Sequence, residues 1–242
     1  MRLIRVGGLL ALVGCYSSQQ TFSDTVSAEG VGLFDASTDR GDVSYDGGSP
    51  RNLFEISGRS WSNADGPSKA ATREQTNTYS IDVVDGALVA RGRSPQRRSG
   101  VDFSVLGPPM INTYIDAPSG DVQLDAVEGI HVATANSITG RQIYGDVDFF
   151  ADSSGIDVEV FPYADGVVDI TSTAGTVKVY LPWGLDYDLT IISDPDYEME
   201  LDDLGFDSLV AEAGLTVGWR GFREIQVRID VTGGDLYIYQ SN

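Results

Sequence analysis

A short phrase recurs along most of this chain: a glycine, then an aspartate or a small residue, then an apolar segment. Between residues 120 and 175 these glycines follow one another mostly at intervals of 9 to 11 residues, with one interval of 16. Glycine adopts positive φ angles without strain and aspartate bonds to nearby backbone, so each phrase predicts a turn that starts a short strand. The glycines of the phrase are Gly41, Gly120, Gly129, Gly145, Gly155, Gly166, Gly175 and Gly234.

The segments between these turns alternate apolar and polar residues, which is the pattern of a strand with one buried face. The clearest example spans residues 225–231. The same alternation is found in residues 122–125, 156–160, 177–181 and 236–239. No segment carries a convincing helical stripe, although residues 207–213 are compatible with one or two helical turns ended by Gly214. The pattern therefore predicts an all-β protein.

Two all-β architectures use such units: an antiparallel β-sandwich with turns every 8–12 residues, and a right-handed parallel β-solenoid, or β-helix-like repeat. Stacked layers of a solenoid place like residues above like, so nearly identical turn phrases are expected there. A sandwich has no reason to repeat its turn chemistry. The repetition favours the solenoid, and the sandwich remains the alternative.

Residues 115–134 resemble the bacterial adhesin-domain family DUF4097, in which a Pro-Ser-Gly-Asp-Val phrase, here beginning at Pro118, alternates with glycine–valine phrases. The resemblance continues through residues 145–149 and 171–182, and it weakens over 183–205. It implies a β-solenoid that acts as an envelope-associated or surface binding module. The resemblance carries no catalytic residues over to this chain.

The first residues of the chain resemble a bacterial lipoprotein signal. Arg2 and Arg5 form a basic start, residues 6–13 are apolar, and Cys15 follows Gly14 as in a lipobox. The apolar run is far shorter than the roughly 20 residues that cross a bilayer, but it suits a signal peptide. We therefore expect a diacylglyceryl group on the Cys15 thiol that anchors the protein to a membrane. The alternative is an ordinary secretory signal with a chance cysteine.

These features divide the chain into a lipoprotein signal peptide at residues 1–14, a flexible tether at residues 15–30 and a β-solenoid adhesin domain at residues 31–242. The tether is expected because its residues are polar, rich in serine and threonine, and without period. An aspartate directly after the lipidated cysteine resembles an inner-membrane retention signal. Because Tyr16 stands there instead, we expect an extracytoplasmic protein on the outer rather than the inner membrane.

Charge and residue usage exclude several classes of function. The formal net charge is −20, with 36 acidic and 16 basic residues, which argues against nucleic acid as a partner. A single cysteine and a single histidine exclude a disulfide framework, a zinc ribbon and a multi-histidine metal centre. The sequence predicts no cofactor.

Acidic residues offer the main route to catalysis. Two carboxylates on one face of a β-helix can cleave glycans, so a carbohydrate-active enzyme, a glycoside hydrolase or lyase, is the alternative function. Solubility alone also accounts for acids at outward positions, and we therefore expect no catalytic residues. The outward acids are Asp121, Asp125, Asp146, Asp148, Asp157 and Glu159.

An acidic segment and the single histidine are the remaining candidates for metal binding or catalysis. Residues 194–207 hold seven acids in fourteen residues but lack calcium-loop spacing, so we expect a solvated loop and no metal. His131 lies between Ile130 and Val132, and if those two face the core the histidine faces solvent. It is expected to be an exposed strand residue without a role in catalysis.

Two groups of residues are candidates for ligand contact. Arg91, Arg93, Arg97 and Arg98 form a basic cluster on an acidic chain, which could bind carboxylate or phosphate unless neighbouring acids pair with it. Tyr237 and Tyr239 alternate with apolar residues and could stack on sugars. The sequence thus predicts a lipid-anchored, non-catalytic binding or scaffold module of the cell envelope. An envelope glycan or another envelope protein is its expected partner.

Overall fold

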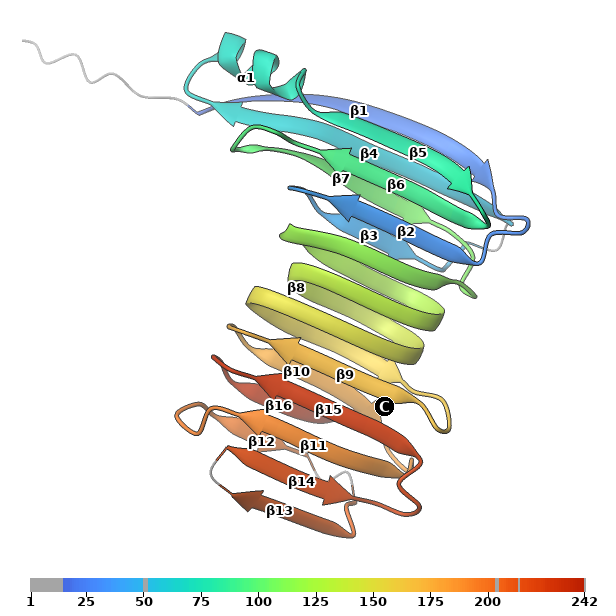
Figure 1. The fold of residues 1–242 in the computed structure, drawn as a ribbon, viewed down its shortest axis with the longest axis vertical. Helices are drawn as coiled ribbons and strands as arrows, with labels where there is room; N and C mark the ends of the chain where they lie inside the picture. The colour runs from blue at the N-terminus through green and yellow to red at the C-terminus, as the bar shows by residue number, and fades with distance from the viewer. Residues whose placement is uncertain (1–14, 50–51, 203–204, 213, 242) are drawn as a thin grey trace, which may run out of the picture.

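The computed structural model describes residues 15–49, 52–202, 205–212 and 214–241. These residues form one mixed sixteen-stranded sheet and a single short helix, arranged as an elongated stack (Figure 1). The all-β expectation is confirmed. The elements are β1 (Tyr16–Ser27), β2 (Leu33–Thr38), β3 (Val43–Asp46), β4 (Leu53–Ala64), α1 (Pro67–Glu74), β5 (Thr78–Val84), β6 (Ala87–Arg93), β7 (Ser99–Leu106), β8 (Asn112–Phe161), β9 (Val167–Ser172), β10 (Val177–Pro182), β11 (Tyr187–Ser193), β12 (Met199–Leu201), β13 (Ser208–Glu212), β14 (Leu215–Trp219), β15 (Ile225–Val231) and β16 (Leu236–Ser241).

Parallel pairing dominates the middle of the stack. Strand β8 is 50 residues long and winds back on itself (Figure 1). Its successive segments pair in parallel with β2, β3, β9 and β10. Beyond β8 the parallel ladders continue through β15 to β11 and through β16 to β12.

Antiparallel strands lie at both ends of the stack. At one end β1 pairs with β4, β4 pairs with β7, and β5 pairs with β6. At the other end β14 lies between β11 and β13. The helix α1 packs against β1 and β4, so the two ends differ in structure.

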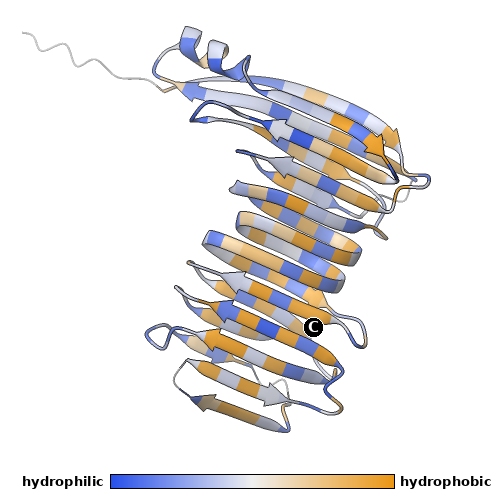
Figure 2. Cartoon of the chain, in the orientation of Figure 1, coloured by the Kyte–Doolittle hydropathy of each residue, from blue (hydrophilic) through white to orange (hydrophobic). Residues whose placement is uncertain are grey.

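The core is a set of columns of apolar side chains between the ladders. Val158, Val179 and Ile238 are paired residues of three neighbouring strands, and each is fully buried. A second column contains Val168 and Val227, which are also buried. Figure 2 shows the apolar and polar positions alternating along the strands. The expected inward positions in residues 177–181 and 225–229 are therefore confirmed.

All the recurring glycines except Gly166 lie directly against another of them in a neighbouring layer. A Cβ on Gly120 would sit 1.8 Å from the carbonyl oxygen of Gly41, and one on Gly234 would sit 2.0 Å from that of Gly175. Real Cβ atoms do not approach backbone so closely, so a side chain at these positions would push the layers apart. The glycine of the phrase is thus required by stacking as well as by turn geometry.

The aspartates of the phrase also act between layers. The Asp42 carboxylate accepts a hydrogen bond from the backbone N–H of Asp121 at 3.0 Å. The Asp146 carboxylate accepts one from the backbone N–H of Val167 at 2.9 Å. Each side chain thus satisfies a backbone donor of the next layer. This explains why glycine and aspartate recur together.

Three expectations about local structure are corrected. Residues 16–27, expected within a flexible tether, form β1, which pairs with β4 along its whole length. Residues 208–212 form strand β13 instead of helical turns. The helix α1, which begins at Pro67, was not expected.

No helix in the described part of the chain is long and apolar enough to cross a membrane. The expected signal peptide, residues 1–14, lies outside the described residues.

His131 is buried, contrary to the expectation that it faces solvent. Ala126 adopts a positive φ of 52° at a corner of β8, and this shifts the alternation so that Val127 and His131 point inward. Ile130 is 54% exposed instead. The His131 Nδ1 atom lies 3.1 Å from the Thr113 hydroxyl, and burial lowers the pKa of His131 to about 4.

Candidate binding surfaces

Three tyrosines lie side by side on one outer surface of the stack. Tyr180 on β10 and Tyr239 on β16 are paired in the parallel register, and Tyr237 lies two residues before Tyr239. The Tyr180 and Tyr239 ring centroids are 5.2 Å apart. The rings of Tyr237 and Tyr239 are 6.0 Å apart with their planes 11° from parallel. Val179 and Ile238 point into the core, so alternation turns all three tyrosines outward.

Charged side chains border these tyrosines. The Arg141 guanidinium carbon lies 5.2 Å from the centre of the Tyr180 ring, and the guanidinium forms a 2.7 Å ion pair with Asp157. Lys178 is paired with Tyr237 across the ladder. A hollow of about 270 Å³ adjoins them and is lined in part by Lys178 and Asp157. Tyr180, Tyr237, Tyr239, Arg141 and Lys178 are called the tyrosine face below.

Desolvation and acidic neighbours raise the pKa of two of these tyrosines, Tyr237 and Tyr239. Desolvation raises the pKa of Tyr237, and its 3.2 Å hydrogen bond to the Glu198 carboxylate acts in the same direction. Desolvation also raises the pKa of Tyr239, with the nearby Glu200 charge as the next cause. The tyrosine face therefore presents apolar ring surface and hydroxyl groups, bordered by two cations and by the Glu198 and Glu200 carboxylates. This combination can stack on a sugar ring and hydrogen-bond to its hydroxyls.

Several of the acids considered for catalysis are occupied by structural hydrogen bonds. Asp121 accepts hydrogen bonds from Asn136 at 3.1 Å and from the Ser137 hydroxyl at 2.7 Å. Asp125 accepts the backbone N–H of Arg141 at 2.9 Å. The same holds for Asp146 and Asp157, which bind Val167 and Arg141. The Glu159 carboxylate accepts the Ser241 hydroxyl at 2.5 Å.

Asp148 differs from these acids because its ladder neighbour is another carboxylate, Asp169. Desolvation raises the pKa of Asp169, and the charges of Asp148 and Asp230 raise it further. Arg228, the ladder neighbour of Asp169 on its other side, opposes this shift. The pair lies on the outer surface of β8 and β9.

Two carboxylates of the acidic segment 194–207 accept hydrogen bonds from backbone N–H groups of later strands and turns. Asp202 accepts the N–H of Gln240 at 3.1 Å, and Asp207 accepts that of Gly221 at 2.8 Å. Asp203 lies outside the described residues. In the part of the chain that the structure describes, no group of three or more His, Cys, Asp or Glu side chains could hold a metal ion.

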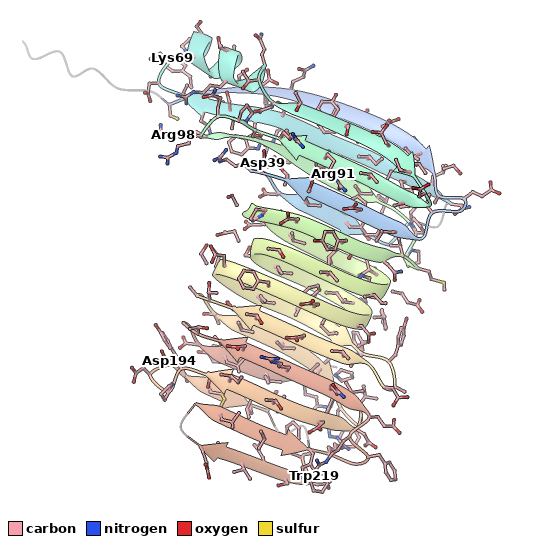
Figure 3. All side chains as sticks on the ribbon, in the orientation of Figure 1. Asp39, Lys69, Arg91, Arg98, Asp194 and Trp219 are labelled. Carbon is pink, nitrogen blue, oxygen red and sulfur yellow. The ribbon has the colours of Figure 1, made fainter. Side chains whose placement is uncertain are left out.

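The structure divides the arginine cluster in two. Arg91 points from β6 toward Asp35, and their side chains form an ion pair. Arg97 and Arg98 lie instead in the loop after β6, where both are exposed. Arg98 is 3.7 Å from Asp65, and Arg93 is exposed at the end of β6. Figure 3 shows Arg98 and Lys69 of α1 at the same end of the stack, with Arg91 apart from them.

Cys15 is exposed and directly precedes β1. Tyr16, the first residue of β1, pairs with Ala64 at the end of β4. The thiol is therefore held close to the end of the stack that carries α1.

Sequence reasoning missed Tyr180 and Arg141 as members of the tyrosine face. The alternation in residues 177–181 already placed Tyr180 outward, but its contact with Tyr239 depends on a parallel register between strands 59 residues apart. Arg141 comes from the corner that follows Gly140 in β8, where no periodic signal marks it. Lys69 and Arg73 belong to α1, whose existence was not expected.

No protein-family model matches the chain, and no curated protein sequence matches it. Among solved structures, the fold is similar to that of a "putative cell adhesion protein" from Clostridium sporogenes ATCC 15579, with a TM-score of 0.53 and 11% identity. That match covers 93% of this chain and 100% of the clostridial chain, and it shows a shared fold.

Two further structures match more weakly. A "putative adhesin" from Bacteroides fragilis NCTC 9343 has a TM-score of 0.29 and 12% identity, covering 91% of this chain and 98% of that one. A "putative adhesin" from Parabacteroides merdae ATCC 43184 has a TM-score of 0.24 and 7% identity, covering 92% of each chain. These two share too little backbone geometry with this chain to bear on its function.

Proposed function

We propose that this protein is a lipid-anchored binding module of the cell envelope, adhesin-like and non-catalytic, built as a right-handed parallel β-solenoid of the DUF4097 kind. Parallel ladders on both sides of β8 and stacked glycine–aspartate corners support the solenoid. The clostridial structure of similar fold is described as a cell adhesion protein, which supports the adhesin-like role.

The tyrosine face is the surface that binds the ligand, and the ligand is an envelope glycan. The observation that carries this is the register of β10 and β16, which brings Tyr180 and Tyr239 within 5.2 Å of each other on an outward surface. Rings held by a hydrogen-bonded ladder lose little conformational freedom on binding. Arg141 is paired with Asp157, and the Glu198 and Glu200 carboxylates border the rings, so a neutral glycan suits this face better than an anionic one.

Glycan-array binding of the mature protein tests this assignment. Tyr180→Ala with Tyr239→Ala should weaken binding about tenfold, which corresponds to about 1.4 kcal/mol. The matched control replaces Tyr114 and Tyr197 with alanine, because both are exposed tyrosines outside the tyrosine face. Equal losses in the two double variants would contradict a glycan site on the tyrosine face.

The membrane anchor is the diacylglyceryl group on Cys15, and the expected location is the outer membrane. An exposed cysteine directly before β1 leaves the thiol accessible to the modifying enzyme. Cys15→Ala should accumulate as an unprocessed precursor that no longer enters the detergent phase. A Cys15→Ala protein that matures and partitions like the parent would contradict lipid attachment.

A further inference from the structure

The end of the stack next to Cys15 is rich in basic residues, although the chain as a whole is acidic. Tyr16 pairs with Ala64, and the backbone N–H of Asn63 donates to the Arg98 carbonyl at 2.7 Å. The loop that carries Arg98 therefore lies against the end of β4, which pairs with the residue that follows Cys15. The anchor end is defined here as Cys15, α1 and the loop at residues 94–98.

Four basic side chains belong to the anchor end. Lys69 and Arg73 lie on α1, and Arg97 and Arg98 lie in the loop. Arg98 faces Asp65 at 3.7 Å, but both side chains are about two-thirds exposed, so water screens this pair strongly. Arg73 donates to the Asn63 carbonyl at 2.9 Å, which holds its guanidinium near the strand without neutralising it.

A hollow on this surface has a lining suited to an anion. Its volume is about 360 Å³, and Lys69 and Arg73 contribute its positive charges. Ser68, Thr72 and Thr76 line the same hollow, and the Thr72 and Thr76 hydroxyls donate to the backbone carbonyls of Ser68 and Arg73. The two cations of the hollow, Lys69 and Arg73, are therefore the groups that match the oxygen atoms of a phosphate.

The rest of the stack carries the opposite charge. Between residues 99 and 202 the only basic residues are Arg141 and Lys178. Figure 3 shows Asp194 and Trp219 in the half of the stack remote from Lys69 and Arg98. A negatively charged surface would therefore attract the anchor end and repel the remainder of the molecule.

The strand β1 fixes the distance between the lipid and these cations. A flexible tether of about fifteen extended residues would span roughly 50 Å, well beyond the Debye length of about 8 Å at physiological salt. In the structure, Tyr16 is already paired with β4, so Cys15 is one residue away from the folded part. A lipid on Cys15 would keep the basic side chains within the range of headgroup charge.

We propose that Lys69, Arg73, Arg97 and Arg98 form a docking surface for the anionic phosphate headgroups of the membrane in which Cys15 is anchored. This inference rests on the lipid attachment proposed above. Headgroup binding adds to the lipid anchor and holds the stack upright, with its acidic remainder directed away from the bilayer. Polybasic surfaces and acyl chains stabilise membrane attachment together in this way.

Hydrogen exchange on the lipidated mature protein tests the proposal. The protein is reconstituted into vesicles of phosphatidylcholine, or of equal parts phosphatidylcholine and phosphatidylglycerol, and flotation is measured first. On the anionic vesicles, amides of residues 66–76 and 94–98 should exchange at least about tenfold more slowly than on the neutral ones. High salt should remove this difference, because the attraction is screened.

Two double variants of equal charge change provide the control. Lys69→Gln with Arg97→Gln should abolish most of the protection on anionic vesicles. Arg223→Gln with Arg228→Gln, two exposed arginines outside the anchor end, should leave it intact. Equal effects of the two pairs would show that net charge alone is responsible and would overturn the docking surface.

The remaining outcomes separate the proposals from one another. A protein that floats with both vesicles but exchanges equally on them retains its lipid anchor and lacks the headgroup site. A protein that fails to float with neutral vesicles contradicts both the lipid anchor and the docking surface. Equal protection by inorganic phosphate without vesicles would overturn headgroup docking in favour of a site for free anions.

Discussion

The ring of Phe22 stacks on the ring of Tyr79, with centroids 3.8 Å apart and planes 12° from parallel. Phe22 belongs to β1, which pairs with β4, and Tyr79 belongs to β5, which pairs with β6. The contact therefore joins the last strands of two ladders. Phe22 also packs edge-on against Phe103, at 5.8 Å between ring centroids, so it closes this end of the core.

Phe22→Ala should detach β1 more readily from the stack. The expected loss is about 2 kcal/mol of unfolding free energy, since the ring is only partly buried. Hydrogen exchange of residues 16–27 and urea denaturation measure the two effects. Thr21→Ala, at the neighbouring exposed position, should change neither, and equal effects of both variants would contradict the assigned role of Phe22.

Gly120→Ala should destabilise the protein by at least about 2 kcal/mol, because its Cβ would meet the Gly41 carbonyl oxygen at 1.8 Å. Gly32→Ala is the matched control, since a Cβ at Gly32 would have no atom within 4 Å. Thermal unfolding of both variants measures the difference. Equal melting temperatures for the Gly120→Ala and Gly32→Ala proteins would disprove close stacking of these corners.

Val179→Asp should cost several kcal/mol, because Val179 is fully buried and the new carboxylate would have no partner. Lys178→Asp, one residue earlier and on the outer surface, should cost under about 1 kcal/mol. Chemical denaturation compares the two. Similar losses would mean that the assigned register of β10 is wrong.

His131 should make stability depend on pH in a defined window. Its pKa falls from an ordinary value of 6.5 to about 4 on folding, so the unfolded chain binds the proton first as pH decreases. Stability due to this group is complete above pH 6.5 and is lost progressively as pH falls toward 4, by about 3 kcal/mol at most.

The measurement is the difference between the parent and His131→Gln in unfolding free energy at several pH values. The carboxylates contribute equally to both proteins and cancel in this difference. A difference that stays constant between pH 7 and pH 4 would show that His131 is not buried as a neutral group.

We expect no turnover of polysaccharides. The adjacent carboxylates Asp148 and Asp169 are the pair that most resembles a glycan-cleaving site, and Arg228 offers Asp169 an opposite charge. Release of reducing sugar or of unsaturated uronate is the assay. Activity above background that disappears in Asp148→Asn with Asp169→Asn would establish the enzyme function instead.

The sequence predicted which side chains of the later strands point inward, because alternation is a local property that Val177 and Val179 display by themselves. It could not place Tyr180 next to Tyr239, since that contact depends on which strands pair and in what register. His131 was misplaced because one positive φ at Ala126 reverses the alternation, and alanine gives no signal of such a corner.

Strand β1 was missed for a different reason. Its side chains are largely exposed, and only isolated residues such as Phe22 and Val26 pack against the core, so its polar composition is that of a tether. Backbone hydrogen bonds to β4 fix the segment instead, and these do not depend on side-chain identity.

Because β8 winds back on itself in similar layers, the length of this molecule can change by the insertion or loss of one winding. One additional winding, with its glycine and aspartate corners, would bury the same columns of side chains as its neighbours and leave both ends unchanged. Each insertion would add about one strand spacing, roughly 4.8 Å, between Cys15 and the tyrosine face. Chains of this architecture can therefore differ in length while keeping both ends of the stack and the tyrosine face unchanged.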